Sequence, residues 1–353
     1  MSVIKTPHGY YAFRVYITIN GVRKQIYRSD PTWTRKSHAL SAQEQFLKST
    51  TNPDPLSFGE VVSLYLEDKR LTLKKNTLYN VEMLLHNHIC PTFNEMRIDR
   101  ILYPNIQTWQ RSLAMKPFSN EHMTKIQKTL KSVFHYAYLH DLIDKDPTKA
   151  MKYVKVEETP KKRTILTPGE FNQFLSVVDD PIYKTMYLVL YWCGLRIGEA
   201  CALTFDDVDL AKGTLTVNKT YNFQFHEVHS PKTRNSYRLV EMPLLVASEV
   251  SKLIQFYRGK YEHDHSSPLF PMTSFPRMRR RLNEWITLSK SPTFTHHDFR
   301  HSCVSLLANA GFNDFQAAKR MGHDVKMFNE VYGHLFDSEQ KKMTKAMDKM
   351  SKN

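Results

Sequence analysis

The sequence predicts an α+β protein that is predominantly helical, with a small N-terminal β-sheet plus helix module, an all-helical domain and a mixed, mainly helical domain that contains a small antiparallel sheet. Three observations support this class. Apolar and polar residues alternate near the N-terminus, helical spacing dominates residues 56–155, and a charged, proline-containing stretch at 156–163 interrupts the apolar pattern. A length of 353 residues agrees with two or three domains.

Basic residues exceed acidic residues along the whole chain. The 50 Lys and Arg outnumber the 35 Asp and Glu, which gives a formal charge of +15. The excess is +5 in each of the segments 1–55, 56–155 and 156–353. Hydrophobic residues make up 41% of the chain, enough for packed cores, so a disordered basic tail is excluded. The charge favours a polyanion, nucleic acid above all, although basic enzymes with small acidic substrates also exist.

The cysteines and the hydropathy pattern narrow the class of protein further. The four cysteines are widely spaced and form no CxxC pair, which indicates neither a disulfide framework nor a cysteine-rich zinc site. The first residues lack the apolar region of a signal peptide. The most apolar run, residues 186–195, is half as long as a membrane span. We therefore expect a cytoplasmic protein with no membrane partner.

The first 50 residues predict two strands and a helix. Residues 11–19 alternate in polarity, Asn20-Gly21 supplies a two-residue hairpin turn, residues 22–28 return, and residues 37–47 have helical spacing. A two-stranded ribbon fits the DNA major groove, and a solvated sheet face is the alternative. The candidate DNA-binding residues on this ribbon are Arg14, Tyr16, Arg23, Lys24 and Arg28.

Residues 56–155 predict a compact helical domain. The amphipathic pattern is clearest over residues 124–139, where apolar residues recur at steps of three and four. Its lysines are candidate phosphate contacts, although solvated helix faces have the same composition; those we select are Lys74, Lys125, Lys128 and Lys131. The linker follows at 156–163, and Thr167-Pro168-Gly169-Glu170 then predicts a helix start. Strands are expected only at 214–218 and 237–242 beyond this point.

Four separated segments of the last domain carry polar residues that neither a core nor a surface requires. Each segment alone has a structural alternative, such as a capped helix junction for the first and a surface turn for the second. Residues three apart on a helix share a face, so His297 and Arg300 can address one point. The segments contain, in order, Arg196 with Glu199, Lys232, His297 with Arg300, and His323 with Tyr332.

Taken together, these segments resemble the tyrosine recombinase (phage integrase) family. The resemblance rests on Gly-Leu-Arg-x-Gly-Glu at 194–199, Lys-Thr with a downstream Ser-x-Arg at 232–238, His-x-x-Arg-His at 297–301, Gly-His at 322–323 and Tyr332, nine positions after His323. The order of the two preceding domains is similar to that of integrases that bind accessory arm sites. The resemblance therefore implies an arm-site DNA-binding domain at 1–50, a core-site DNA-binding domain at 56–155, and a catalytic domain with a C-terminal helix at 164–353.

The resemblance implies a site-specific DNA recombinase that cleaves and rejoins DNA through a 3′-phosphotyrosine intermediate and so integrates and excises a mobile element. Tyr332 would be the nucleophile, Arg196 and Arg300 would clamp the phosphate oxygens, and Lys232 would be the general acid for the leaving 5′ oxygen. His297 would assist proton transfer at the tyrosine, His323 would donate to the phosphate, and Glu199 would orient the network. No metal, ATP or other cofactor is implied, because side chains supply the charge and the phosphotyrosine bond conserves the energy of the cleaved diester.

The partners implied by the resemblance are double-stranded DNA with core and arm attachment sites, and three further protomers in a homotetramer that passes through a Holliday junction. A host bending protein and an excisionase are also implied, in a bacterial, nucleoid-associated setting. Methionines at 343, 347 and 350 form an apolar stripe that could dock on a neighbouring protomer or pack within its own chain.

Three other classes of protein compete with this interpretation. A metal-dependent hydrolase could use His296, His297 and His301, but no HExxH glutamate or carboxylate cluster completes a ligand set. A non-catalytic DNA-binding regulator would explain the helix–Gly–helix rhythm of residues 313–332 but not the arginines and lysine. A relaxing topoisomerase would share the tyrosine chemistry without specific DNA sites.

Overall fold

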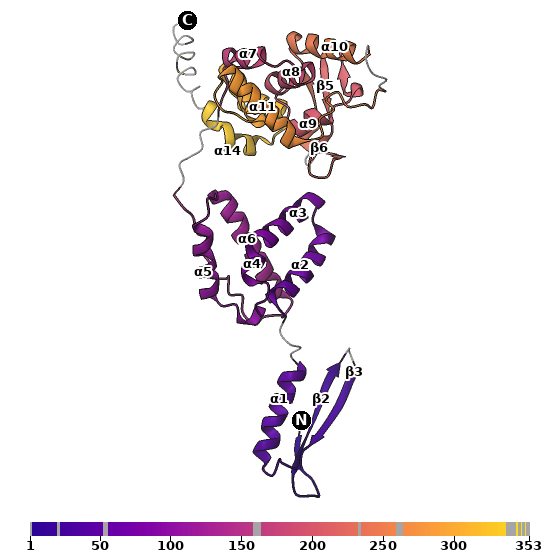
Figure 1. Ribbon diagram of the computed structural model, residues 1–353, viewed down its shortest axis with the longest axis vertical. Helices are drawn as coiled ribbons and strands as arrows, with labels where there is room; N and C mark the ends of the chain where they lie inside the picture. The colour runs from indigo at the N-terminus through magenta and orange to yellow at the C-terminus, as the bar shows by residue number, and fades with distance from the viewer. Residues whose placement is uncertain are drawn as a thin grey trace. The chain divides into compact units, whose positions relative to one another are not determined.

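The computed structural model describes residues 2–19, 22–51, 56–157, 164–231, 234–258 and 264–336, together with Thr344, Met347 and Met350. The chain divides into two compact units, Met1–Thr159 and Pro160–Asn353. The predominantly helical fold with small antiparallel sheets confirms the predicted fold class (Figure 1). None of the described helices is long and apolar enough to cross a membrane.

The N-terminal module is a three-stranded antiparallel sheet with one helix beside it. Strands β1 (Ser2–Lys5), β2 (Tyr11–Ile19) and β3 (Val22–Ser29) lie in the order β1-β2-β3, and α1 (Lys36–Thr51) contacts β2 (Figure 1). Phe13 and Val15 are buried, and the Phe13 ring packs against Trp33 and Phe46. Strand β1 was not predicted from the sequence. The Asn20-Gly21 turn lies outside the described residues.

The register of the hairpin divides the candidate DNA-binding residues between its two faces. Arg14 pairs with Tyr27 and Tyr16 with Gln25, and all four side chains are exposed on the face away from the buried residues. Arg28 pairs instead with Phe13, and its guanidinium lies 4.9 Å from the centroid of the Phe46 ring. Arg28 therefore belongs to the α1 side of the sheet. The side chains of Arg23 and Lys24 lie outside the described part of the chain.

The helical domain is built from α2 (Phe58–Thr72), α3 (Lys75–Leu84), the π-helical turn η1 (Leu85–Ile89), α4 (Cys90–Phe93), the 3-10 turn η2 (Ile98–Arg100), α5 (Tyr103–Ala114) and α6 (Asn120–Leu139). Ser57 and Glu60 form a capping box that begins α2. One apolar cluster, with Phe58, Phe93 and Phe134 at its centre, unites these helices. Gln110 and Gln127 bind each other and the backbone of residues 152–154 within this core.

The four selected lysines of the helical domain differ in their surroundings. Lys74 precedes α3 and is exposed, as is Lys128 on α6. Lys125 is also exposed, but its ammonium group donates to Glu121 at 2.7 Å. Lys131 is partly buried. Lys74 and Lys128 are therefore the lysines of this set that the structure leaves most accessible to a phosphate.

The C-terminal unit opens with α7 (Pro168–Ser176), whose start at the Thr167–Glu170 capping box confirms the predicted boundary. Next come α8 (Pro181–Leu188), the π-helical turn η3 (Val189–Cys193), α9 (Ile197–Ala202), η4 (Phe205–Asp207), β4 (Val208–Asp209), β5 (Thr214–Val217), β6 (Thr220–Asn222), β7 (Glu227–His229), η5 (Arg234–Ser236) and β8 (Arg238–Glu241). The last helices are α10 (Leu244–Arg258), α11 (Phe275–Ser289), α12 (His296–Asn309), α13 (Asp314–Met321) and α14 (Val325–Phe336).

The strands of this unit form two small antiparallel sheets. β4, β5 and β8 make one sheet, and β6 pairs with β7 in a second (Figure 1). The sequence analysis expected only the segments that became β5 and β8, because two- and three-residue strands carry no readable alternation. An aromatic core that includes Phe171, Phe174, Tyr187, Trp285 and Phe299 holds the helices around the sheet.

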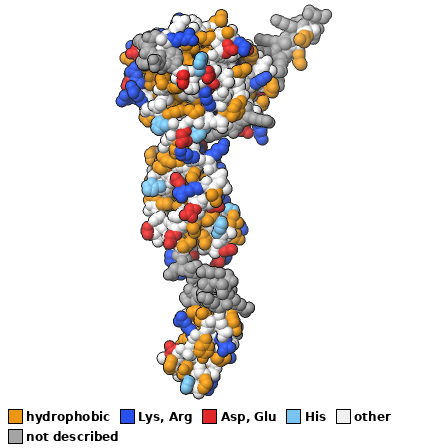
Figure 2. All heavy atoms as spheres, turned by 90° about the vertical axis from the view of Figure 1, so that its right-hand side faces the viewer, with side chains coloured by type: hydrophobic (Ala, Val, Ile, Leu, Met, Phe, Trp, Pro, Cys, Tyr) orange, Lys and Arg blue, Asp and Glu red, His pale blue; other side chains and the backbone are white. Residues whose placement is uncertain are grey.

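Charged side chains of both signs are spread over the surface. Figure 2 shows basic and acidic groups interspersed on the visible face of the C-terminal unit. This distribution agrees with the even charge excess along the sequence. Of the methionine stripe, Met347 and Met350 are exposed, and Met343 lies outside the described residues.

Candidate active site

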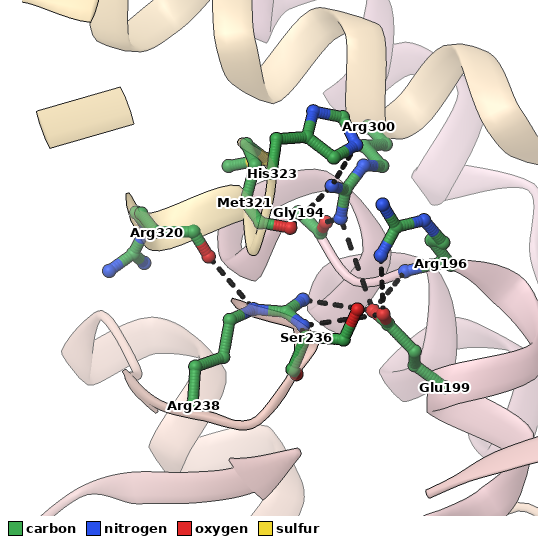
Figure 3. Close-up of polar contacts among 9 residues, drawn as sticks. All are labelled: Gly194, Arg196, Glu199, Ser236, Arg238, Arg300, Arg320, Met321 and His323. Carbon is green, nitrogen blue, oxygen red and sulfur yellow. Dashed lines mark hydrogen bonds and ion pairs between the residues drawn. The ribbon is translucent and has the colours of Figure 1, made fainter. Parts of the chain in front are cut away.

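Glu199 lies at the centre of the polar cluster in the C-terminal unit. Gly194 ends the preceding helical turn in the left-handed conformation (φ 68°), and Arg196 is then the N-cap of α9. The Arg196 backbone N–H donates to Oε2 of Glu199 at 2.9 Å, and its guanidinium donates to Oε1 at 2.7 Å (Figure 3). Glu199 is only 4% exposed. The helix start thus fixes both groups relative to each other.

Arg238 approaches the same carboxylate from β8. Its guanidinium donates to both oxygens of Glu199, at 2.9 and 3.3 Å, and to the carbonyls of Ser236 and Arg320 at 3.1 and 2.9 Å (Figure 3). Only 6% of the Arg238 side chain is exposed. Arg238 therefore joins the sheet, α9 and the end of α13 at one point.

Arg300 of α12 supplies the third guanidinium. It is fully buried and donates to the carbonyl of Gly194 at 2.6 Å, to the carbonyl of Met321, and to Nε2 of His323 at 3.0 Å (Figure 3). Its nearest approach to Glu199 is 3.9 Å. Arg300 presents no surface to solvent, whereas about a third of the Arg196 side chain is exposed.

Two glycines allow this close packing. A Cβ on Gly194 would lie 2.5 Å from the terminal carbon of Met321, and one on Gly322 would lie 2.9 Å from the carbonyl oxygen of Asn235. Both glycines have positive φ, which disfavours other residues. Glycine at these two positions lets the segments that carry Arg196, Arg238 and His323 meet.

The cluster has an excess of positive charge. Burial opposes ionisation of Glu199, but the hydrogen bond and charge of Arg238, with the charges of Arg196 and Arg300, lower its pKa to about 2. Burial and the charge of Arg196 lower the pKa of Arg300 to about 9, which leaves it charged at neutral pH. Three guanidinium groups around one carboxylate therefore form a site that favours an anion.

His323 is neutral in this environment. Burial, followed by the charges of Arg300, Arg196 and Arg238, lowers the pKa of His323 to about 3. Because a guanidinium only donates, Nε2 of His323 accepts from Arg300, and the imidazole proton resides on Nδ1. No hydrogen-bond partner is present for this buried Nδ1 among the described residues. His323 can therefore act as a neutral donor once an acceptor reaches it.

Tyr332 of α14 lies beside this cluster and is buried, with 2% of its surface exposed. Its ring stacks near His323, at 6.3 Å between centroids, and packs on Phe328 at 4.9 Å. The hydroxyl lies 2.7 Å from Nδ1 of His301. His297 is exposed, and its ring meets the ring of His301 edge to face at 4.5 Å.

The structure brings most of the predicted residues together. Arg196 hydrogen-bonds Glu199 and Arg300 hydrogen-bonds His323, an ion pair of 3.9 Å between Arg300 and Glu199 joins the two pairs, and Tyr332 packs against their edge. The ring of His297 contacts the ring of His301, and His301 contacts the hydroxyl of Tyr332. Lys232 lies outside the described residues.

The sequence analysis did not select Arg238 or His301 as site residues. Both stand within quoted motifs, as the arginine of Ser-x-Arg and the last residue of His-x-x-Arg-His. The expected site already contained two arginines to bind the phosphate, so there was no reason in the sequence to select a third arginine. No group of His, Cys, Asp and Glu that could hold a metal ion occurs among the described residues.

Comparisons with known proteins match both units. A family profile described as "Phage integrase family" matches residues 164–339, and one described as "Phage integrase, N-terminal SAM-like domain" matches residues 57–114. The chain is 27% identical to the ICEBs1 integrase of Bacillus subtilis (strain 168), an alignment that covers 99% of each chain. It is 25% identical to the prophage integrase IntR of Escherichia coli (strain K12), over 80% of this chain and 77% of the relative.

Two solved structures have a similar fold. The Tn1549 transposon integrase in complex with a circular intermediate DNA superposes with a TM-score of 0.68 at 25% identity, over 82% of this chain and 99% of that chain. A lambda integrase dimer bound to a COC′ core site superposes with a TM-score of 0.60 at 14% identity, over 78% and 95% of the two chains. The second likeness concerns the fold alone.

The substitution Arg238→Gln tests the central cluster. It leaves the buried Glu199 without its principal partner, and we expect a loss of about 3 kcal/mol in the free energy of unfolding of the C-terminal unit. For a unit of this size that corresponds to a fall of about 6 to 12 °C in its unfolding midpoint, measured by calorimetry. Arg258→Gln, an exposed arginine of α10, is the matched control and should shift the midpoint little. Equal midpoints for the two variants would contradict the assigned role of Arg238.

The lowered pKa of Glu199 predicts a pH dependence of stability. Because the carboxyl is more acidic in the folded chain, its contribution of about 3 kcal/mol is present above the ordinary carboxyl pKa and disappears as the pH falls toward 2. Glu199→Gln should be less stable than the native chain at pH 7, but its unfolding midpoint should fall less between pH 5 and pH 3. Glu241→Gln, an exposed glutamate of β8, should follow the native pH profile. Parallel profiles for Glu199→Gln and the native chain would refute the assignment.

Proposed function

The chain belongs to the phage integrase family of tyrosine recombinases, and from this premise we propose how its residues carry out the reaction. It is a site-specific DNA recombinase that cleaves and rejoins DNA through a 3′-phosphotyrosine intermediate and so integrates and excises a mobile element. The observation that carries the proposed residue roles is the cluster of three arginines around Glu199, with His323 and Tyr332 at its edge.

The first step is the attack of Tyr332 on the scissile phosphate. A phenol has an ordinary pKa of about 10 and attacks a phosphodiester only as it loses its proton. The tyrosine oxygen forms a bond to phosphorus, the bond from phosphorus to the 5′ oxygen breaks, and the DNA 3′ end stays on the enzyme. His297 assists proton transfer on the tyrosine side.

The arginines stabilise the charge that develops on the phosphate. Arg196, with a partly exposed side chain, and Arg300, which donates to His323, contact the non-bridging oxygens. His323 donates to the phosphate from its protonated Nδ1. Such preorganised donors are each worth about a hundredfold or more in rate.

Lys232 protonates the leaving 5′ oxygen. Arg238 follows Lys232 six positions later in the sequence and donates to Glu199 in the cluster. Glu199 orients Arg196 and does not react. The reaction needs no metal and no ATP, because side chains supply the positive charge and the phosphotyrosine bond retains the energy of the cleaved diester.

The two N-terminal modules hold the DNA. We assign the helical domain to the core site, because the family profile of an N-terminal SAM-like domain matches part of it. The sheet module is assigned to accessory arm sites, because Arg14 and Tyr16 share an exposed face of its three-stranded sheet. Each module has an apolar core of its own.

The active assembly is a homotetramer that exchanges strands pairwise through a Holliday junction, aided by a host bending protein and an excisionase. The Holliday junction complex of lambda integrase shares the fold of this chain and is a tetramer in the description of its structure. The residues after α14, including Met347 and Met350, would dock on a neighbouring protomer, since both methionines are exposed.

A non-catalytic regulator does not account for the cluster. The segment with a helix-turn-helix rhythm is α13, Gly322 and α14, and it contributes the Met321 carbonyl, His323 and Tyr332 to the polar site. Because these two helices supply residues to the polar site, we do not assign them to a DNA groove.

The nucleophile assignment predicts the loss of a covalent adduct. On a nicked suicide substrate the native chain should form a protein–DNA adduct that resists SDS, and Tyr332→Phe should form none while still binding the core site. Tyr138→Phe, an exposed tyrosine of the helical domain, is the control and should retain adduct formation. If Tyr332→Phe formed the adduct at the native rate, the assignment of Tyr332 as the nucleophile would be wrong.

The arm-binding assignment predicts a selective loss of affinity. The double variant Arg14→Ala/Tyr16→Ala should bind a duplex that carries arm sites at least about 30-fold more weakly, since it removes two contacts worth about 1 to 3 kcal/mol each. Its affinity for a duplex with the core site alone should be unchanged. Arg35→Ala, an exposed arginine of the same module, serves as the control. Equal losses on both duplexes, measured by titration at one salt concentration, would contradict the arm-site role.

A further inference from the structure

We propose that His301 is the catalytic base that takes the phenol proton of Tyr332, with His297 in contact behind it. This inference rests on the proposed function and names the proton acceptor that the function requires. It differs from the role drawn from the motif, in which His297 serves the tyrosine directly.

The proposal rests on the contact between the hydroxyl oxygen of Tyr332, which is the reacting atom, and the imidazole of His301. The Tyr332 oxygen lies 2.7 Å from Nδ1 of His301, and the two ring centroids are 5.3 Å apart. His301 is 7% exposed and Tyr332 is 2% exposed. Bulk water therefore has little access to this pair. The imidazole of His301 is the base that lies next to the phenol of Tyr332 when the phenol ionises.

The chemistry of imidazole suits this position. With the proton on Nε2, Nδ1 of His301 accepts a hydrogen bond from the tyrosine hydroxyl. The unprotonated nitrogen of an imidazole is a base, so it can take a proton during the attack and return it during religation. A base within hydrogen-bond distance of the proton it removes meets the geometric requirement for general-base catalysis.

The positions of the neighbouring residues connect this base to the phosphate clamp. His301 follows Arg300 on α12, and successive helical residues face different neighbours. Arg300 reaches His323, while His301 reaches Tyr332, whose ring stacks near that same His323. One helix turn thus supplies both a phosphate ligand and the base for the nucleophile.

The proposed reaction moves one proton from Tyr332 to His301 and one from Lys232 to the leaving oxygen. The Tyr332 proton moves to Nδ1 of His301 as the phenolate oxygen bonds to phosphorus. The bond from phosphorus to the 5′ oxygen breaks, and that oxygen takes a proton from Lys232. In religation the 5′ hydroxyl attacks, its proton returns to Lys232, and the departing tyrosine oxygen recovers its proton from His301. His297 contacts the His301 ring edge and positions it.

The first experiment compares two DNA substrates that differ in the leaving group. One is the native suicide substrate, and in the other sulfur replaces the bridging 5′ oxygen, so that the leaving group needs no proton. On the native substrate His301→Gln and Lys232→Ala should each slow adduct formation about a hundredfold or more. On the sulfur substrate Lys232→Ala should recover, whereas His301→Gln should stay slow. Recovery of His301→Gln on the sulfur substrate would place its defect on the leaving-group side and overturn the proposal.

A second experiment separates proton removal from packing. Tyr332 is replaced by a fluorinated tyrosine whose phenol is more acidic, in the native chain and in the His301→Gln chain. The fluorinated residue should restore most of the rate lost in His301→Gln and change the native rate little. If His301 only packs against the tyrosine, the acidic analogue gives no selective rescue, and the proposal fails. Core-site binding is measured for every variant, to confirm that each is folded.

The matched control is His296→Gln. His296 is a buried histidine of the same helix whose ring faces Tyr187 and Phe275. A folded His296→Gln chain should form the adduct at the native rate and show no rescue by the fluorinated tyrosine; the same rescue in this variant would overturn the proposal. Failure of the proposed function is distinguishable, because the native chain would then form no adduct on either substrate.

Discussion

The buried ion cluster around Glu199 is the interaction on which the catalytic unit depends. One carboxylate accepts hydrogen bonds from Arg196 at the start of α9 and from Arg238 on β8, and Arg300 on α12 lies within 3.9 Å. A buried carboxylate is costly unless charged donors surround it. Because the donors outnumber it, the same contacts that join helices to sheet leave the positive charge that a DNA phosphate requires.

The cluster also determines where the nucleophile rests. Arg300 binds the carbonyl of Met321 and the imidazole of His323, so the end of α13 is attached to the clamp. The following helix, α14, then packs Tyr332 against His323 and His301. Arg300 and Tyr332 are both buried beside each other's contacts, so the packing of α12, α13 and α14 places the two groups in one region.

Local patterns of apolar and capping residues in the sequence predicted much of the fold. The alternation in residues 11–19 and the capping box at Thr167 and Glu170 predicted elements that the structure contains. The strands β1, β4, β6 and β7 were missed; β4, β6 and β7 contain only two or three residues each, too few to show a period. Arg14 and Arg28 occupy opposite faces of the hairpin, a separation set by strand register rather than by composition.

The sequence by itself predicted the chemistry of the site, because its arginines, histidines and tyrosine stand in the family's order, from which we infer a phosphate clamp and a nucleophile. Only the tertiary structure decided which group meets which. Arg238 is 39 residues from Glu199, and His301 is 31 residues from Tyr332, yet each pair forms a hydrogen bond. Such contacts depend on how β8, α9, α12 and α14 pack, and side-chain partners across packed elements leave no periodic signal in the sequence.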